Sequence, residues 1–458
     1  MRHLWFVVAA LFSGSLAACG NDSAKGTGSP TTPSTTAPTA GSEPTEAKTP
    51  PPVAEIKQPP PEEPKPEPAP PAPREQPVAG HDFTETGKTL AIVGACHPGA
   101  TPEGYSEKLI ADHCKKINAA QTEYTDRWVK LAKPFFAERV PSAAAKKVVY
   151  PFSGGDLSTA LTVYPDADEI TTMSLEPAGD PRTLQALNDA ATKPGGKDGK
   201  ATKPSPQAKQ ALDKALGTVR YELDFLYRVN FSNTSNMRDA MRSGTLPTQL
   251  IFSLSALKVH GYEIVSLRYF TLNDDGSIKY LSDEDVTGAP SPLEGVGDGR
   301  ITEKRNRIFS NSEIRFRKPG GKIQIHRQIR QDLSDKELQK DPRVVKHLEM
   351  KGPIVSMTKA ASYLLSWDSF STMRNYLTKN TSWMVSDATG VAPKWGTAAG
   401  FEYETYGSFR TAHLDSGNGV SENWRTLFNS QEKRRLAFRF GYYDKDTKDH
   451  LIIMKKKS

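Results

Sequence analysis

The 458-residue chain has few cysteines and no long apolar segment beyond its first residues. Three cysteines are too few for a domain held together by a disulfide framework. The absence of a further apolar run of about 18 residues excludes a protein with several membrane-spanning helices. No repeat recurs with a period of roughly 20 to 50 residues, which excludes a solenoid. The sequence also lacks His-Glu-x-x-His, Cys-x-x-Cys and P-loop motifs, so we expect no bound metal ion and no cofactor.

The N-terminus carries the most specific pattern of the chain. Met1-Arg2-His3 supplies a positive end, and an apolar stretch follows that is too short to span a bilayer. It ends in Leu16-Ala17-Ala18-Cys19, which resembles the lipobox of bacterial lipoproteins. The resemblance implies that residues 1–18 are a signal peptide, that cleavage precedes Cys19, and that Cys19 is lipidated and holds the protein on a membrane. An ordinary signal peptide with a cysteine at the cleavage point is the alternative.

The residues after Cys19 bear on where the anchored protein resides. Gly20 and Asn21 replace the aspartate that, by the same resemblance, favours retention at the inner membrane. We therefore expect a protein of the bacterial cell envelope, anchored at the outer membrane and facing either the periplasm or the surface.

Residues 19–80 have the composition of a tether. Seventeen of the 35 prolines fall between Pro30 and Pro77, and proline removes backbone donors and fixes φ. Such a segment forms no core and populates extended polyproline II. At about 3.1 Å per residue, the residues from Pro30 to Pro77 alone reach up to roughly 150 Å when fully extended. The segment is predicted to be a disordered spacer, either spanning part of the envelope or serving as a passive stalk.

Residues 81–458 are long enough for one large α/β domain, and a division into two subdomains near residue 290 stays open. Outside the cytoplasm thiols oxidise, so Cys96 and Cys114 are expected to pair. The neighbouring His97 and His113 suggest a Cys2His2 zinc site instead, but the close cysteine pair of structural zinc sites is missing.

The body alternates between strand and helix patterns. A strand at 147–150, a turn, a helix at 157–164 and a strand at 169–175 form a Rossmann-like β-turn-α-β unit over residues 147–176. A helical stripe of apolar residues runs from Ile117 to Phe135, and hairpins are expected around Asn273–Gly276 and Pro319–Gly321. Further strands are predicted near 354–357, 383–386, 436–442 and 450–454. The predicted fold is α/β, with a mixed sheet covered by helices.

The turn at Ser153 is the first candidate site. Gly154 and Gly155 follow it at the start of a helix, where backbone N–H groups favour anions, and Glu176 lies about 20 residues further on, as an acidic residue does in dinucleotide folds. The Gly-x-Gly-x-x-Gly pattern is absent, so a structural turn is the main alternative. The turn also resembles the nucleophile elbow of α/β-hydrolases, and Ser153, Asp387 and His413 occur in the order of that triad.

The second candidate is the basic span from Arg300 to Arg330. It has a net charge of +8, whereas residues 81–458 together have +9. Arg315 and Arg317 alternate with apolar residues, so one face of that strand is cationic, and Lys322 extends the charge. The span indicates an anionic partner, such as lipid head groups or wall polymer, or lysines and arginines that block edge pairing. No aromatic pattern for nucleic acid accompanies the charge.

The third candidate includes Thr358–Leu365 and Asp387–Gly390. With Tyr150–Gly154, Leu175–Gly179 and Phe438–Tyr442, these segments resemble a recurring pattern in uncharacterised exported bacterial proteins. The resemblance implies no activity, and Ser366 and Ala388 replace the His and Asp of that pattern. Lys359, Asp387 and Glu176 are expected to line one pocket at the strand ends. A turn at Asp387 and a solvent-facing Lys359 at a helix start are the alternative.

The sequence as a whole indicates an envelope-anchored lipoprotein whose body binds or organises an anionic envelope component. An envelope serine hydrolase that uses Ser153 is the alternative. The specific ligand and any protein partners leave no recognisable pattern.

Overall fold

The computed structural model describes residues 79–193, 206–230, 246–294, 299–410, 419–441 and 449–457. Residues 75–458 belong to one compact unit. The expected lipidation residue Cys19, most of the tether and His413 lie outside the described residues. Within the described part no helix is long and apolar enough to cross a membrane.

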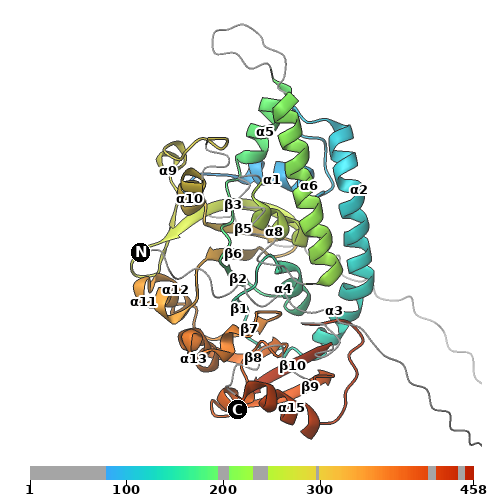
Figure 1. Cartoon of the computed structure of the whole chain (residues 1–458), viewed down its shortest axis with the longest axis vertical. Coiled ribbons are helices and arrows are strands. Elements are labelled where there is room, and N and C mark those ends of the chain that lie inside the picture. The colour runs from blue at the N-terminus through green and yellow to red at the C-terminus, as the bar shows by residue number, and fades with distance from the viewer. Residues whose placement is uncertain are drawn as a thin grey trace, which may run out of the picture. The chain divides into compact units, whose positions relative to one another are not determined.

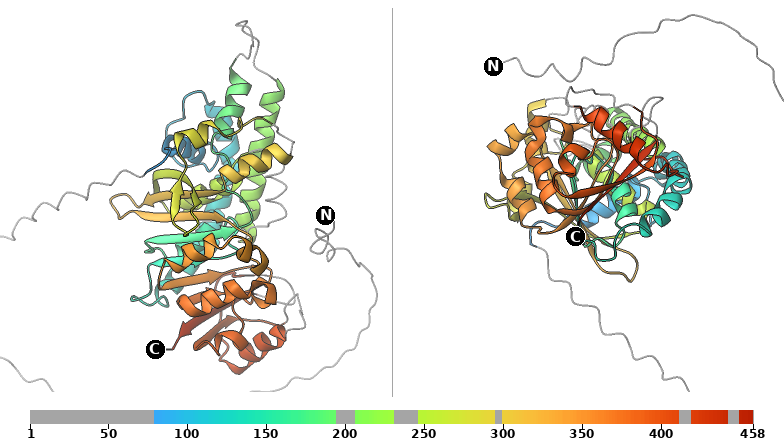
Figure 2. Two further views of the ribbon diagram at one scale, coloured as in Figure 1. Left: turned by 90° about the vertical axis from the view of Figure 1, so that its left-hand side faces the viewer. Right: turned by 90° about the horizontal axis from the view of Figure 1, so that it is seen from below.

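The centre of the body is a single ten-stranded sheet in the order β4-β3-β5-β6-β2-β1-β7-β8-β10-β9 (Figures 1 and 2). The five central strands β6, β2, β1, β7 and β8 are parallel to one another, and both flanks of the sheet are antiparallel. The α/β class and the mixed sheet are thus confirmed. The bounds are β1 Lys147–Tyr150, β2 Glu169–Ser174, β3 Glu263–Leu272, β4 Ile278–Tyr280, β5 Asn311–Arg317, β6 Gln324–Arg330, β7 Ile354–Thr358, β8 Thr381–Ser386, β9 Phe401–Gly407 and β10 His450–Lys456.

The predicted β-turn-α-β unit forms the start of the parallel sheet. β1 and β2 pair in parallel, with Lys147 opposite Glu169 and Tyr150 opposite Thr172. The short helix α4, Leu157–Val163, connects them, and the Asp156 side chain caps it by accepting from the Thr159 backbone N–H. Capping by a side-chain oxygen explains why this seven-residue helix starts directly after the turn.

Helices cover both faces of the sheet, as Figure 2 shows. Side chains of one face pack against α1 Thr84–Val93, α2 Glu107–Tyr124, α3 Lys130–Ala137, α4, α5 Thr183–Thr192, α6 Pro206–Val229 and α8 Thr248–Val259. The other face packs against α11 Asp335–Lys340, α12 Arg343–Glu349, α13 Ser371–Asn380 and α15 Val420–Ser430. The shorter helices are α9 Asp283–Thr287, α10 Gly299–Ile308 and α14 Pro393–Gly396. In β1, Val148 and Tyr150 belong to the first core and Val149 to the second, as the alternation of a strand requires.

The long apolar stripe on α2 changes register where the helix widens. Residues Thr125–Val129 form a π-helical turn between α2 and α3. Its extra residue rotates the following turn, so Leu131 is 45% exposed while Ala132 and Phe136 are buried. The sequence pattern placed Leu131 on the buried face, and the π-turn is the reason that it is not there.

The end of the chain differs from the prediction. Residues 436–441 form no strand, although their alternating apolar residues suggested one. Gly441 has a φ of 72°, outside the range of extended strands, and Phe438 and Phe440 are buried in the first core. β10 pairs with β8 on one side and with β9 on the other, and β9 was not predicted from the sequence. The described part of the 436–442 segment is therefore a loop packed against the core.

Candidate functional site at the carboxyl ends of β1, β7 and β8

The chain crosses the sheet in opposite directions on the two sides of β1. From β1 it passes through α4 to β2 on one side, whereas β7 lies on the other side. In open α/β sheets such a switch point leaves a crevice outside the carboxyl ends of the two strands, where ligands bind. In this protein the segments at the switch point are 151–156 after β1, 359–363 after β7 and 387–390 after β8. We call these segments and the side chains between them the switch-point cluster.

A buried ion pair lies at the centre of the switch-point cluster. The Lys359 Nζ is 2.6 Å from the Asp156 Oδ2, and the two side chains are 0% and 3% exposed. Lys359 also donates to the Thr159 Oγ1 at 2.6 Å and to the Asn230 Oδ1 at 3.3 Å. Asp156 accepts a further hydrogen bond from the Tyr150 hydroxyl at 3.1 Å. The expectation that Lys359 faces solvent at a helix start is therefore wrong.

The environment of Lys359 is aromatic as well as polar. Its Nζ lies 5.5 Å from the ring centroid of Trp128 and 5.8 Å from that of Phe440. Burial lowers the pKa of the Lys359 ammonium, and the charges of Asp156 and Asp387 oppose the shift. Burial of an amine next to a carboxylate makes proton exchange between the two groups accessible, because burial destabilises both charged forms.

Asp387 connects two loops of the switch-point cluster. Its carboxylate accepts hydrogen bonds from the backbone N–H of Ala360 and of Thr389, both at 2.9 Å. Gly441 packs directly on it, since a Cβ at Gly441 would lie 2.3 Å from the Asp387 Cβ. The neighbouring Arg439 carbonyl accepts a hydrogen bond from the Trp128 Nε1 at 2.6 Å. The loop 436–441 thus contacts the π-helical turn through Arg439 and the end of β8 through Gly441.

Backbone strain is concentrated in this region. Six described residues other than glycine have a positive φ, and five of them belong to the switch-point cluster or contact it: Phe152 (56°), Asn230 (61°), Ala360 (52°), Ser362 (52°) and Tyr363 (58°). Left-handed conformations of such residues are costly, and they persist where the surrounding structure imposes them, often at functional sites. This clustering was not visible in the sequence.

The Ser153 turn is closed rather than open to a ligand. The Ser153 hydroxyl donates to the carbonyls of Met173 at 3.2 Å and Gly154 at 3.3 Å. A Cβ at Gly155 would lie 1.9 Å from the Phe252 ring, so the glycine permits the close approach of α8. No described histidine hydrogen-bonds to Ser153, and the predicted partner His413 lies outside the described residues. Asp387 accepts hydrogen bonds from the backbone N–H groups of Ala360 and Thr389 and so organises two loops.

Glu176 follows β2 and is buried, at 1% exposure. Its backbone carbonyl accepts a hydrogen bond from the Ser174 hydroxyl at 3.3 Å. A small cavity of about 20 Å³ lies in the segment that follows, lined by Pro177, Gly179 and Arg305 among others. This volume suits a single water molecule and is too small for an organic ligand.

The predicted cationic residues lie at the opposite edge of the sheet from the switch-point cluster. β6 starts at Gln324 and runs parallel to β2, so the β5–β6 turn lies at the amino ends of the parallel strands. Arg315 pairs with the buried Glu313 at 3.2 Å, which compensates its charge on the sheet face. Arg317 pairs with Glu263 at 2.6 Å and Lys322 with Asp168 at 2.5 Å, all more exposed. The first two candidate sites, the Ser153 turn and the basic hairpin, therefore lie at opposite ends of the parallel strands.

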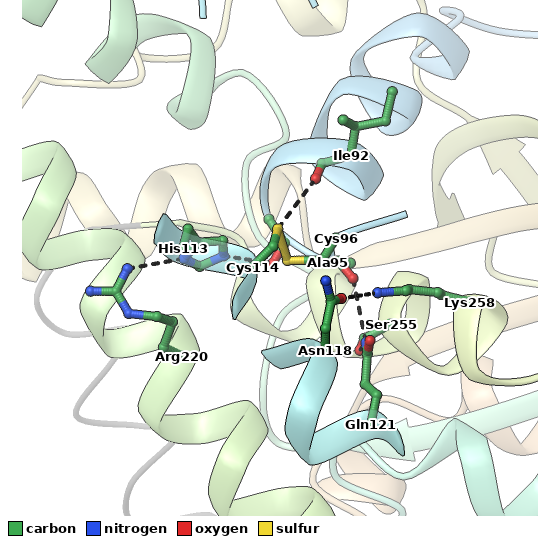
Figure 3. The surroundings of a disulfide bond; sticks show 11 residues. Ile92, Ala95, Cys96, His113, Cys114, Asn118, Gln121, Arg220, Ser255 and Lys258 are labelled. Atoms are coloured by element: carbon green, nitrogen blue, oxygen red, sulfur yellow. Dashed lines mark hydrogen bonds between the residues drawn. A yellow bond between two sulfur atoms is a disulfide. The ribbon is translucent and has the colours of Figure 1, made fainter. Parts of the chain in front are cut away.

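The predicted disulfide between Cys96 and Cys114 is present and joins the end of α1 to α2 (Figure 3). The His113 Nε2 donates to the Gly94 carbonyl at 3.1 Å, and its Nδ1 accepts from the Arg220 guanidinium at 3.2 Å. His97 binds the Leu254 carbonyl at 2.7 Å. The cysteines and histidines proposed as zinc ligands are thus engaged in a covalent bond and in hydrogen bonds. No cluster of three metal-binding side chains occurs among the described residues.

The described residues define a doubly wound α/β fold with a buried, charged switch-point cluster. No family model, curated protein or solved structure matches the chain.

Proposed function

We propose that this protein is a lipid-anchored component of the bacterial envelope whose body binds an anionic envelope component. The lipobox-like sequence at Cys19 supports the anchor, and the proline-rich segment supports a tether between anchor and body. The disulfide supports folding outside the cytoplasm, where such bonds persist. Catalysis is not part of the proposal, since the Ser153 hydroxyl binds carbonyl oxygens and lies in a closed turn.

The observation that carries the binding proposal is the distribution of exposed lysines. We define the basic edge as Lys146, Lys318, Lys322, Lys379 and Lys456. All five are exposed, and they flank the starts of β1, β6 and β8 or the ends of β5 and β10. Since β10 is antiparallel to β8, these positions lie at one edge of the sheet. Residues far apart in the sequence thereby place positive charge on a common surface.

Most of this charge is not cancelled by nearby carboxylates. Lys146, Lys318, Lys379 and Lys456 form no ion pair with any described residue, whereas Lys322 pairs with Asp168. Lys318 lies 4.5 Å from the Tyr262 ring centroid, and Lys456 donates to the Thr378 carbonyl at 3.0 Å. Neither contact neutralises the ammonium. Each of these lysines should contribute about 1 kcal/mol to the free energy of binding to an anionic surface.

A shallow groove accompanies the charge. Gly352, Lys379, Ser382 and Lys456 are among its lining residues, and its volume is about 310 Å³. Two lysines of the basic edge, Lys379 and Lys456, line this groove, and their charges favour a phosphate or carboxylate of a head group or polymer. This supports an anionic envelope component as the partner.

The proposal is tested by co-sedimentation of the protein, produced without its first 19 residues, with vesicles of phosphatidylglycerol and phosphatidylcholine. The test variant carries Lys146→Gln, Lys318→Gln and Lys379→Gln. The matched control carries Lys209→Gln, Lys214→Gln and Lys304→Gln, which are exposed lysines of α6 and α10 without an ion pair to any described residue. The same comparison on isolated wall polymer separates lipid from polymer as the preferred partner.

We expect retention of the unmodified protein on anionic vesicles at low salt and its loss near 1 M salt, where the Debye length falls to about 3 Å. The test variant should bind more weakly and the control should bind like the unmodified protein. Equal binding of both variants, or binding that salt does not change, would contradict the proposal.

A further inference from the structure

Lys359 and Asn230 are in contact although 129 positions separate them in the chain. Asn230 directly follows α6, and Lys359 directly follows β7. The Lys359 Nζ lies 3.3 Å from the Asn230 Oδ1 and 2.6 Å from the Asp156 carboxylate. A primary amine, a carboxamide and a carboxylate therefore meet in one buried place.

We propose that Lys359 and Asn230 form an intramolecular isopeptide bond, promoted by Asp156. The bond joins the Lys359 Nζ to the Asn230 Cγ and releases the Asn230 amide nitrogen as ammonia. The inference concerns a covalent modification of the body and does not depend on the proposed function.

The reaction balances without any further reagent. Asp156 first accepts a proton from the Lys359 ammonium, which leaves a neutral amine with a free electron pair. This amine attacks the Asn230 Cγ, and a new N–C bond forms. The Cγ–Nδ2 bond then breaks, and the nitrogen leaves as ammonia with one proton taken from the former amine and carried by Asp156. No atom is oxidised or reduced, and an amide replaces an amide.

Burial favours the first step. The Lys359 side chain is completely buried, and burial lowers the pKa of its ammonium. In a medium of low polarity an ion pair is less stable relative to its neutral form than in water. The Asp156 carboxylate, at 2.6 Å, is close enough to take the proton directly. Asp156 is thus positioned as a catalytic residue in contact with the reacting nitrogen.

The Asn230 carboxamide has hydrogen-bond contacts on its oxygen and none on its nitrogen among the described residues. The Asn230 Oδ1 accepts a hydrogen bond from Lys359, which polarises the carbonyl toward attack. Its Nδ2 is buried and finds no hydrogen-bond partner among the described residues. Buried amide donors are nearly always satisfied, and an orphaned one needs an explanation. Loss of this nitrogen as ammonia removes the unsatisfied group.

The surroundings exclude water from the reacting atoms. The rings of Trp128 and Phe440 flank the Lys359 Nζ, and both side chains are buried. Asn230 itself is 4% exposed. A dry site strengthens the electrostatic interactions of the step and prevents hydrolysis of the acceptor amide as a side reaction.

The chain contains a matched contact that lacks one of the three groups. The Lys258 Nζ donates to the Asn118 Oδ1 at 2.5 Å, near the disulfide (Figure 3). Burial lowers the pKa of Lys258 to about 8, but no described carboxylate forms an ion pair with it. This lysine-asparagine pair is also exposed to water. It therefore should not react, and it serves as an internal control for the combined roles of Asp156 and burial.

The measurement is the mass of the full chain, purified from a bacterial envelope and reduced, followed by tryptic peptide mapping. An isopeptide bond lowers the mass by one ammonia, about 17 Da. It also joins the peptide 229–238, which contains Asn230, to the peptide 352–374, in which Lys359 escapes cleavage. We expect this branched peptide and no branched peptide that joins Asn118 to Lys258.

Variants distinguish the isopeptide bond from cyclisation of Asn230 with its own backbone, which releases the same mass. Lys359→Arg keeps a cation but removes the reactive amine, so the mass loss should disappear. Asp156→Asn keeps a good helix cap for α4 and both reacting groups, and it should leave the chain unreacted. Circular dichroism of each variant reports whether it folds.

The proposal needs no variant to be refuted. If only linear peptides containing Asn230 and Lys359 are found in the unmodified chain, no isopeptide bond forms. If Lys359→Arg retains the loss of about 17 Da, the loss arises elsewhere, and the proposal is overturned.

Discussion

Removal of the disulfide between Cys96 and Cys114 provides a stability change of calculable size. The two cysteines are 18 positions apart, and the bond closes a loop that includes the segment between α1 and α2 and the first part of α2. For a loop of this length the entropy removed from the unfolded chain corresponds to about 3 kcal/mol at 25 °C. Cys96 has a φ of 63°, a strain that an alanine at the same position shares, so the substitution does not add to it.

The assay is urea unfolding of the double variant Cys96→Ala, Cys114→Ala and of the unmodified protein with and without a reductant. With a slope of about 3 kcal/mol per molar urea, the midpoint should fall by roughly 1 M in the double variant. The reduced protein should behave like the double variant, because both lack only the cross-link. Equal midpoints for oxidised and reduced protein would refute the entropic reasoning. A loss far above about 5 kcal/mol would show that packing of the sulfur atoms contributes more than the cross-link.

Three further predictions concern packing and pH. Gly155→Ala should destabilise the protein by about 1–3 kcal/mol in urea unfolding, because the new methyl meets the Phe252 ring. Gly217→Ala inside α6 has space and should stabilise the protein by about 0.5–1 kcal/mol. A stabilising Gly155→Ala or a destabilising Gly217→Ala would contradict the packing argument. Burial lowers the pKa of His326 to about 3. The neutral imidazole therefore stabilises the fold fully above pH 6.5, and the unfolding free energy decreases by about 1.4 kcal/mol per pH unit between pH 6.5 and pH 3. His326→Gln should flatten the pH dependence of the unfolding free energy in this range. Burial alone would raise the pKa of Glu169, but the charges of Lys351 and Arg327 outweigh burial and hold this pKa at about 2. The carboxylate therefore stabilises the fold fully above pH 4.5, and this stabilisation is lost as the pH falls through 2. Glu169→Gln should remove the stabilisation and cost about 3–5 kcal/mol at pH 7, and an unchanged unfolding free energy would contradict the account.

The local parts of the fold were predictable because their signals are local. The strand at Lys147–Tyr150 and the helix start at Leu157 follow from residues within a few positions of each other. The hairpin of β5 and β6 follows from the turn between them. The disulfide was predictable from the expected location outside the cytoplasm and from the small number of cysteines. Sequence periodicity failed where the backbone departs from regular geometry, as at the π-turn before Leu131.

The centre of the switch-point cluster was only half predictable. Lys359 and Asp387 were identified because they follow apolar strands, and the structure places both at the strand ends. Asp156 was seen only as part of a turn, although an acidic residue directly before a helix is a recognisable cap. Asn230 carries no local signal, because its contact with Lys359 depends on how α6 crosses the sheet. The predicted strand at 436–442 was wrong because alternation cannot distinguish a strand from a loop that buries two phenylalanines.

The separation of the basic edge from the switch-point cluster also lay beyond the sequence. Whether Arg315 and Ser153 share an edge depends on the direction of β5 and β6 relative to β1, which is set by pairing between distant strands. The individual ion pairs of Arg315 and Arg317 likewise depend on cross-strand register. Charge counted along the sequence therefore overestimated the cationic surface of the hairpin and missed Lys146 and Lys379.

The most direct test of the account is the ratio of the vesicle affinities of the two triple lysine variants, measured on the same anionic bilayer at low salt. At about 1 kcal/mol per lysine, neutralising Lys146, Lys318 and Lys379 should weaken binding roughly 100-fold. Neutralising Lys209, Lys214 and Lys304 should leave the affinity within about twofold of the unmodified protein, because these lysines lie away from the basic edge. Equal losses in both variants would mean that net charge alone governs binding and would contradict a specific basic edge.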